Sequence, residues 1–236
     1  MKLAIISGGS KGLGAKLVKQ YAQQGFEVVE FSRSGNTSYS KNVDLSDLTA
    51  ANQVISETLK TLSQHQYSEI IAINNAAMLS PIGPLSDSHT HDWITNINAS
   101  FTSAIVFMGN FVKNFQTHDC RKVIASISSG AALKAYYGWS LYCAGKAGLE
   151  HYIRCVAEEQ AEQAHPVLPI IINPGVIDTD MQSAIRGANE QQFPQLSRFV
   201  ELKNSGTLQQ PAAVATSIRS ILAGDLYAGE RYSVAS

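Results

Sequence analysis

The fold of this chain is decided by a stretch near its start, Lys2-Leu3-Ala4-Ile5-Ile6-Ser7-Gly8-Gly9-Ser10-Lys11-Gly12-Leu13-Gly14. Its apolar first half predicts a β-strand, and its glycines predict a tight turn directly after that strand. The residues from 12 to 24 have the apolar spacing of a helix, which Gly25 ends in the position of a C-cap. A strand, a glycine turn and a helix in this order are typical of the first unit of a parallel α/β sheet.

The same alternation of strand and helix continues along the chain. We expect strands at residues 2–7, 27–31, 42–43, 69–73, 122–127, 167–172 and 231–234. We expect helices at residues 12–24, 47–63, 88–115, 141–164 and 211–223. The prediction is therefore one α/β domain over residues 1–236, a Rossmann-type doubly wound parallel sheet of about seven strands flanked by helices. Residues 178–206 mix polar residues with isolated large apolar ones, and we expect them to form a substrate lid.

The composition narrows the classes of partner. A net charge of −1 argues against nucleic acid and anionic membranes, so a small molecule is the expected partner. The 3 cysteines have neither disulfide-framework nor zinc spacing, which suits a reducing cytoplasm and predicts no metal. No apolar segment approaches the roughly 20 residues of a membrane span, so we expect neither export nor membrane insertion.

The glycine turn predicts a dinucleotide site, although its spacing, Gly8-x-x-x-Gly12-x-Gly14, is not that of the GxGxxG fingerprint. An NAD site carries an acidic residue at the end of the second strand, whereas this chain has Phe31-Ser32-Arg33-Ser34 there. Arg33 could pair with a 2′-phosphate, Ser32 could donate to it, and Lys11 adds a second charge. The sequence favours NADP(H) over NAD; the alternative is that Arg33 is a solvated loop residue.

A second set of residues suits carbonyl reduction. Tyr142 and Lys146 lie four residues apart, so on a helix they share one face, and Ser129 lies 13 residues before Tyr142. A cation about 5 Å from the phenol stabilises phenolate by about 3 kcal/mol, which would lower the tyrosine pKa by roughly two units. Ser129, or its neighbour Ser128, could hold the carbonyl oxygen against Tyr142. Alone, the pair could equally be a surface i,i+4 contact.

With these residues the chain resembles the short-chain dehydrogenase/reductase family over essentially its whole length. The matching motifs are the glycine turn after Ser7, Asn74-Asn75-Ala76-Ala77 for NNAG, Asn98, Ser129, Tyr142, Lys146 and Pro174-Gly175 with Thr179. Two departures are Ser7 for the usual threonine, which conserves the hydroxyl, and Ala77 for the last glycine of NNAG. We expect only a local backbone adjustment at Ala77.

This resemblance implies a set of site residues. The catalytic residues would be Asn98, Ser129, Tyr142 and Lys146, with Asn98 holding a water that relays protons to Lys146. Asp44 would reach the adenine, and Thr179 would lie by the carboxamide or diphosphate. The implied NADP(H)-binding residues are Gly8, Ser10, Lys11, Gly12, Leu13, Gly14, Ser32, Arg33, Asp44, Asn75, Ala76, Tyr142, Lys146, Pro174, Gly175, Ile177 and Thr179.

Within the family, residues 138–148 and 178–182 look most like sepiapterin reductases and bacterial benzil reductases, which reduce vicinal dicarbonyls with NADPH. Sepiapterin reductases place an aspartate near the C-terminus that anchors the pterin, and an ungapped match puts Ser233 there. Because a hydroxyl cannot replace that anionic acceptor, the sequence favours an apolar diketone of benzil type. The expected substrate-contacting residues are Ser129, Trp139, Met181, Phe193 and Phe199.

Other functions stay open at this point. They are sepiapterin reduction, a dehydratase or epimerase on the same fold, and a non-catalytic NADP-sensing regulatory protein. A sensor would have little reason to carry the four catalytic residues together. We expect a homodimer or homotetramer.

Overall fold

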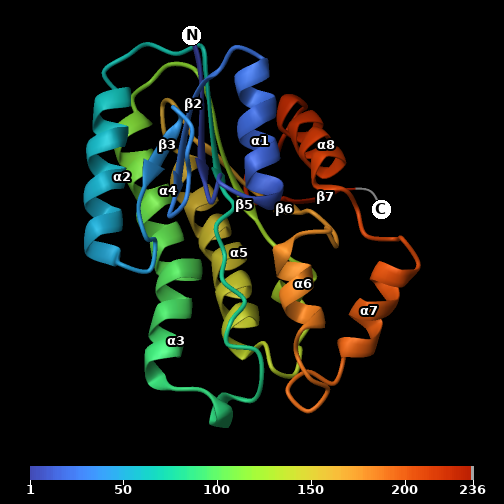
Figure 1. Cartoon of the computed structure of the whole chain (residues 1–236). Helices are drawn as coiled ribbons and strands as arrows, with labels where there is room; N and C mark the ends of the chain where they lie inside the picture. Colours follow the sequence, from blue (N-terminus) through green and yellow to red (C-terminus); the bar gives the residue numbers. More distant parts are fainter. Residues whose placement is uncertain (235–236) are drawn as a thin grey trace.

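A computed structural model describes residues 1–234, and its centre is a parallel sheet of seven strands (Figure 1). The order across the sheet is β3-β2-β1-β4-β5-β6-β7, and every neighbouring pair is parallel. The strands are β1 (Lys2–Ser7), β2 (Glu27–Ser32), β3 (Ser40–Asn42), β4 (Glu69–Asn74), β5 (Arg121–Ile127), β6 (Leu168–Asn173) and β7 (Arg231–Ser233). The predicted Rossmann-type fold is confirmed.

Helices cover both faces of this sheet, as parallel strands require. The helices are α1 (Gly12–Gln23), α2 (Leu48–Leu62), α3 (Thr90–Ile97), α4 (Ser103–Phe115), α5 (Ser140–Gln160), α6 (Asp180–Arg186), α7 (Leu196–Asn204) and α8 (Pro211–Ala223). Leu3 and Ile5 point to a core shared with α2, α4 and α5, whereas Ala4 and Ile6 point to one shared with α1 and α8. Successive side chains of a strand point to opposite faces of the sheet, and here both faces are buried.

The predicted helix at residues 88–115 is wrong in its continuity. A π-helical segment, Asn98–Thr102, separates α3 from α4, and the Ser103 N–H donates to the Asn98 carbonyl. A π turn inserts one extra residue per turn, which an apolar pattern cannot reveal because the buried stripe continues on both sides of it. The segment Asn98–Thr102 is also where the predicted catalytic asparagine lies.

Residues 178–206 contain two helices that the sequence did not predict, α6 and α7. In Figure 1 they lie beyond the carboxyl edge of the sheet. Lys203 Nζ lies 2.6 Å from Asp178 Oδ2, which ties the end of α7 to the start of the segment. None of the helices within residues 1–234 is both long and apolar enough to cross a membrane.

The glycine turn packs so closely that one of its glycines is a structural requirement. A Cβ placed on Gly14 would overlap the Gly8 carbonyl oxygen and lie 2.7 Å from Asn75 Nδ2. In the middle of α4, a Cβ on Gly109 would meet only Tyr152 Oη, at 4.0 Å. Gly14 therefore lets α1 approach the turn, whereas Gly109 leaves room for a methyl group.

We expect Gly14→Ala to lower the free energy of unfolding by about 2–3 kcal/mol, because the new methyl overpacks backbone. Gly109→Ala, the control, should leave stability unchanged or raise it by about 0.5–1 kcal/mol, since alanine favours the helix. Urea denaturation of both variants checks this, and equal effects of the two substitutions would contradict it.

Candidate active site

One hydroxyl fixes the glycine turn to the neighbouring strand. Ser7 Oγ donates to Asn74 Oδ1 at 3.0 Å and accepts from the backbone N–H groups of Asn75 and Ala76 at 3.1 and 3.2 Å. Asn75 Nδ2 in turn donates to the Gly8 carbonyl at 2.9 Å. The Ser7 hydroxyl therefore joins the carboxyl ends of β1 and β4, next to the cavity described below.

A cavity of about 730 Å³ lies at the carboxyl edge of the sheet. Its lining comes from the glycine turn, from the ends of β2, β4, β5 and β6, and from the segment 178–206. The predicted site residues that it brings together are Gly8, Ser10, Lys11, Gly12, Leu13, Ser32, Arg33, Asp44, Asn75, Ala76, Ser129, Trp139, Tyr142, Lys146, Pro174, Gly175, Ile177, Thr179, Met181 and Phe199.

The glycine-turn end of this cavity suits an anion. Gly8 and Gly12 have φ angles of +71° and +51°, which only glycine adopts without strain. Lys11 is the N-cap residue of α1, and its side chain makes no capping hydrogen bond. The first turn of α1 also holds no acidic residue. Its backbone N–H groups are therefore offered to a phosphate, which the helix dipole also favours.

The end of β2 contributes charge and hydroxyl groups. Arg33 NH1 lies 3.8 Å from Asp44 Oδ2, and a hydrogen bond from the Ser46 backbone holds the pKa of Asp44 below its usual value. Ser32 Oγ, however, donates to Glu30 Oε1 at 3.2 Å. This end of the cavity is also lined by the cationic side chains of Lys11 and Arg33 and by the hydroxyls of Ser10 and Ser34.

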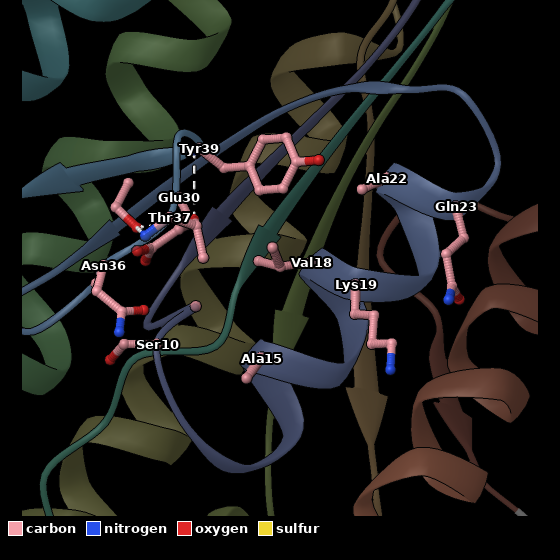
Figure 2. Close-up of a pocket in the computed structure, with 13 residues that line it drawn as sticks. Ser10, Ala15, Val18, Lys19, Ala22, Gln23, Glu30, Asn36, Thr37 and Tyr39 are labelled. Carbon is pink, nitrogen blue, oxygen red and sulfur yellow. Dashed lines mark hydrogen bonds between the residues drawn. The ribbon is translucent and has the colours of Figure 1, made fainter.

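A second hollow, of about 590 Å³, lies on the other side of this strand end (Figure 2). Figure 2 shows Glu30, Thr37 and Tyr39 on one side of it, with Val18 and Lys19 of α1 on the other. It shares only Ser10 with the larger cavity.

Over residues 1–234, no three His, Cys, Asp or Glu side chains gather as a metal site requires.

The reactive groups meet where α5 passes the end of β5. Lys146 Nζ donates to the Ile127 carbonyl at 2.6 Å and lies 5.7 Å from the centroid of the Tyr142 ring. Ser129 Oγ accepts from the Ala131 N–H at 3.1 Å and is also a hydrogen-bond partner of Tyr142. Ser128 Oγ instead donates to Glu150 at 2.6 Å. The structure therefore brings Ser129, not Ser128, to the phenol.

Burial sets the ionisation of both reactive groups. Burial raises the pKa of Tyr142 to about 12, although the hydrogen bond with Ser129 acts to lower it. Burial lowers the pKa of Lys146 to about 8, although the negative charge of Glu150 acts to raise it. The expectation that Lys146 would lower the Tyr142 pKa is wrong for this structure, since desolvation dominates and the amine is bound to Ile127. Tyr142 is therefore a protonated phenol at neutral pH.

Beyond Tyr142 the cavity has an aromatic wall. The Trp139 ring is 5% exposed and lies 5.9 Å from the Tyr142 ring. Phe193 stacks behind Trp139 at 4.6 Å, and Phe199 lies 5.4 Å away. Lining residues of this end that sequence reasoning missed are Leu79, Tyr136, Gln182, Ile185 and Arg198. Most come from the segment 178–206 or from loops, where no regular pattern marks them.

The family model for short chain dehydrogenases matches residues 2–190. The chain belongs to the short-chain dehydrogenase/reductase family. Curated relatives include a benzil reductase ((S)-benzoin forming) of Bacillus subtilis, 34% identical over 99% of this chain and 98% of that protein. The enzyme of the same name from Bacillus cereus is 32% identical over 94% of each chain.

More distant members match less fully. A sepiapterin reductase of Mus musculus is 29% identical over 67% of this chain and 60% of that enzyme. Among solved structures, a short chain dehydrogenase/reductase of Saccharomyces cerevisiae has a TM-score of 0.82 at 21% identity and covers 99% of this chain and 96% of that one. The chain is therefore an oxidoreductase of a family that uses a nicotinamide cofactor.

The residues present fit such a cofactor. The open N-terminus of α1 and the two glycines with positive φ angles form a cradle for a diphosphate. A Cβ on Gly12 would lie 3.2 Å from Thr179 Cγ2, so a side chain at that position would crowd the cradle. Lys146 and Tyr142 line the same cavity and would lie toward the nicotinamide ribose.

Three predicted site residues do not line the cavity. Gly14 is a packing position, because a Cβ there would overlap the Gly8 carbonyl oxygen. Phe193 is fully buried behind Trp139 and supports the wall without forming its surface. Asn98 Nδ2 donates to the Ser46 carbonyl at 3.4 Å, so its relay to Lys146 stays a prediction.

Ser233 lies outside the cavity, contrary to the prediction that it takes the position of a pterin-anchoring aspartate. Ser233 pairs with Asn173 in β7, is exposed and does not line the cavity. The ungapped match to the pterin-anchoring aspartate therefore carries no argument about the substrate, because Ser233 does not lie at the cavity.

We predict that Tyr142 is the proton donor and that Lys146 both acts on Tyr142 and binds the cofactor. We expect Tyr142→Phe to remove nearly all carbonyl reduction while leaving the Kd of the cofactor almost unchanged, because only the hydroxyl is lost. Lys146→Met should raise the cofactor Kd and lower kcat together, since one amine serves both. Fluorescence titration and single-turnover kinetics measure these effects, and substantial turnover by Tyr142→Phe would exclude Tyr142 as the acid.

Proposed function

We propose that this chain is an NADPH-dependent carbonyl reductase that transfers hydride to one ketone of a small, largely apolar 1,2-dicarbonyl of the benzil type. The observation that carries the proposal is the meeting of Ser129, Tyr142 and Lys146 with an aromatic wall in one cavity. The full-length similarity to two benzil reductases supports it.

The chemistry needs a proton at oxygen as hydride reaches carbon. When bound, the nicotinamide cofactor supplies the hydride. Tyr142, held as a phenol by its burial, donates the proton to the carbonyl oxygen. Ser129 holds the same oxygen by a hydrogen bond, which strengthens as negative charge develops there. Lys146, whose pKa burial lowers to about 8, returns a proton toward Tyr142 after the reaction in this proposal.

The preference for NADPH depends on Arg33, Lys11 and Ser10. Arg33 offers a fork of N–H donors that matches a phosphate, and Asp44 lies close enough to orient it. No acidic side chain at the end of β2 faces the cavity, because Glu30 is buried and accepts from Ser32. A 2′-hydroxyl therefore finds no carboxylate acceptor at the end of β2, where NAD sites provide one.

The substrate class follows from the wall. Trp139 and Phe199 offer aromatic surface, and Leu79, Met181 and Ile185 add aliphatic surface. Each phenyl ring buried there is stabilised by about 1.5–3 kcal/mol, whereas a pterin would bury a polar edge. Residues 178–206 supply Met181, Ile185 and Phe199, so we propose that this segment closes over the substrate as a lid.

We expect Arg33→Asp to raise the KM for NADPH by about tenfold or more and to change that for NADH far less, since a charge-assisted pair is replaced by repulsion. Lys60→Asp, an equal charge change on the exposed side of α2, should change neither. Steady-state kinetics with both cofactors measure this, and an unchanged preference in Arg33→Asp would make Arg33 a surface residue only.

Benzil should be reduced with a higher kcat/KM than sepiapterin, because both of its rings can be buried. Met181→Asn should lower kcat/KM for benzil more than for diacetyl, whose methyl groups are too small to depend on that wall. Val200→Asn, an exposed substitution on α7, is the control and should change neither. NADPH consumption followed at 340 nm measures both, and a clear preference of the unmodified protein for sepiapterin would replace the benzil assignment with the pterin one.

A further inference from the structure

The chemistry above leaves one buried carboxylate unused. Glu150 lies on α5 four residues after Lys146, so both side chains project from the same face of the helix. Glu150 is 2% exposed, and burying an ionised carboxylate is costly unless donors surround it. Its surroundings therefore indicate what it does.

Three donors from separate parts of the chain satisfy this carboxylate. Ser128 Oγ and Arg231 Nε both donate to Glu150 Oε1, at 2.6 and 2.9 Å. Arg154 NH2 donates to Oε2 at 3.1 Å. Burial alone would raise the pKa of Glu150, but the bonds from Ser128 and Arg231 hold it below its usual value. Glu150 is therefore a carboxylate at neutral pH.

Arg231 extends this cluster to the reactive serine. Its NH2 group donates to the Ser129 carbonyl at 3.2 Å, while its Nε stays on Glu150. The Ser128 N–H donates to the Ile172 carbonyl at 2.7 Å, which fixes the same turn to β6. One guanidinium from β7 thus links α5 to the backbone of the turn that carries Ser129, across 102 residues of sequence.

We propose that Glu150 and Arg231 are positioning residues of the active site. Their ion pair holds the Ser128–Ser129 turn so that Ser129 faces Tyr142, and it keeps a carboxylate beside Lys146. This inference rests on the carbonyl-reductase function proposed above. β7 therefore contributes to catalysis without touching the cavity: none of its residues, Arg231 to Ser233, lines it.

Arg154 provides a matched control within the same cluster. Like Arg231 it binds Glu150, but it projects from α5 itself, is about half exposed and has its side-chain hydrogen bond to Glu150 rather than to the serine turn. A role in folding alone would make the two arginines similar. A positioning role separates them, because only Arg231 reaches Ser129.

Kinetics of the full-length protein test the first half of the proposal. We expect Arg231→Met to lower kcat for benzil by about tenfold or more with a change below about twofold in the KM for NADPH, because a displaced oxygen-holding group slows the chemical step. Arg231→Lys keeps the charge but loses the guanidinium that binds both Glu150 and the Ser129 carbonyl, so it should also lower kcat. Arg154→Gln should stay within about twofold. The proposal would be overturned if Arg231→Met and Arg154→Gln lowered kcat equally, or if neither lowered it.

Spectra of the ligand-free protein test both halves without any turnover. In [15N]-labelled protein the Gly130 amide, which shares a peptide bond with the Ser129 carbonyl, should shift in Arg231→Lys and not in Arg154→Gln. In [13C]-lysine-labelled protein Glu150→Gln should lower the pKa of Lys146, with the signal assigned by its loss in Lys146→Arg. The charged groups that act on this amine are Glu150 directly and, through it, Arg154 and Arg231; Tyr142 faces it as a phenol.

The outcomes separate this inference from the proposed function. If the unmodified protein reduces no dicarbonyl, the proposed function fails and the spectra still decide the positioning role. If it reduces benzil but the Gly130 amide shift is unchanged in Arg231→Lys and the Lys146 pKa is unchanged in Glu150→Gln, the positioning role is wrong and the proposed function stands. Should Arg231→Met not fold, Arg231→Lys decides the kinetics, since it retains the buried charge.

Discussion

A parallel sheet ends all its strands at one edge, and this constraint gathers the active site. The glycine turn with Lys11 follows β1, Arg33 follows β2, the asparagine motif follows β4, and the serine turn follows β5. These segments are far apart in the sequence but adjacent in the order of strands. The cavity exists because right-handed crossovers return the chain to the same end of the sheet each time.

Small polar contacts then fix the segments with the accuracy that chemistry needs. The Ser7 hydroxyl joins two strand ends, Lys146 binds the end of β5, and the Glu150–Arg231 pair joins α5 to β7 and the serine turn. The Ser7 and Lys146 contacts are buried and those of Arg231 partly so, and losing one partner of a buried contact leaves the other without solvent to replace it. The same burial keeps Tyr142 protonated and moves the Lys146 pKa toward neutrality.

The two ends of the cavity differ in the kind of ligand surface they can bind. At the glycine turn, backbone N–H groups, Lys11 and Arg33 offer positive charge to a phosphate. At the other end, stacked aromatic rings offer apolar surface, beside which Gln182 and Arg198 also line the cavity. This division matches a ligand pair in which one member is strongly anionic and the other largely apolar.

The sequence by itself determined what depends on neighbours along the chain. Apolar periodicity predicted the strands and most of the helices, glycine predicted the turn, and the four-residue spacing placed Tyr142 and Lys146 on one helix face. Only the tertiary structure decided that Ser32 turns toward Glu30, that Phe193 supports Trp139 from behind, that Ser233 lies outside the site and that Arg231 reaches Ser129. It also decided the direction of the Tyr142 pKa shift. The physical reason is that burial and long-range hydrogen bonds depend on which elements pack together, and no local pattern encodes that packing.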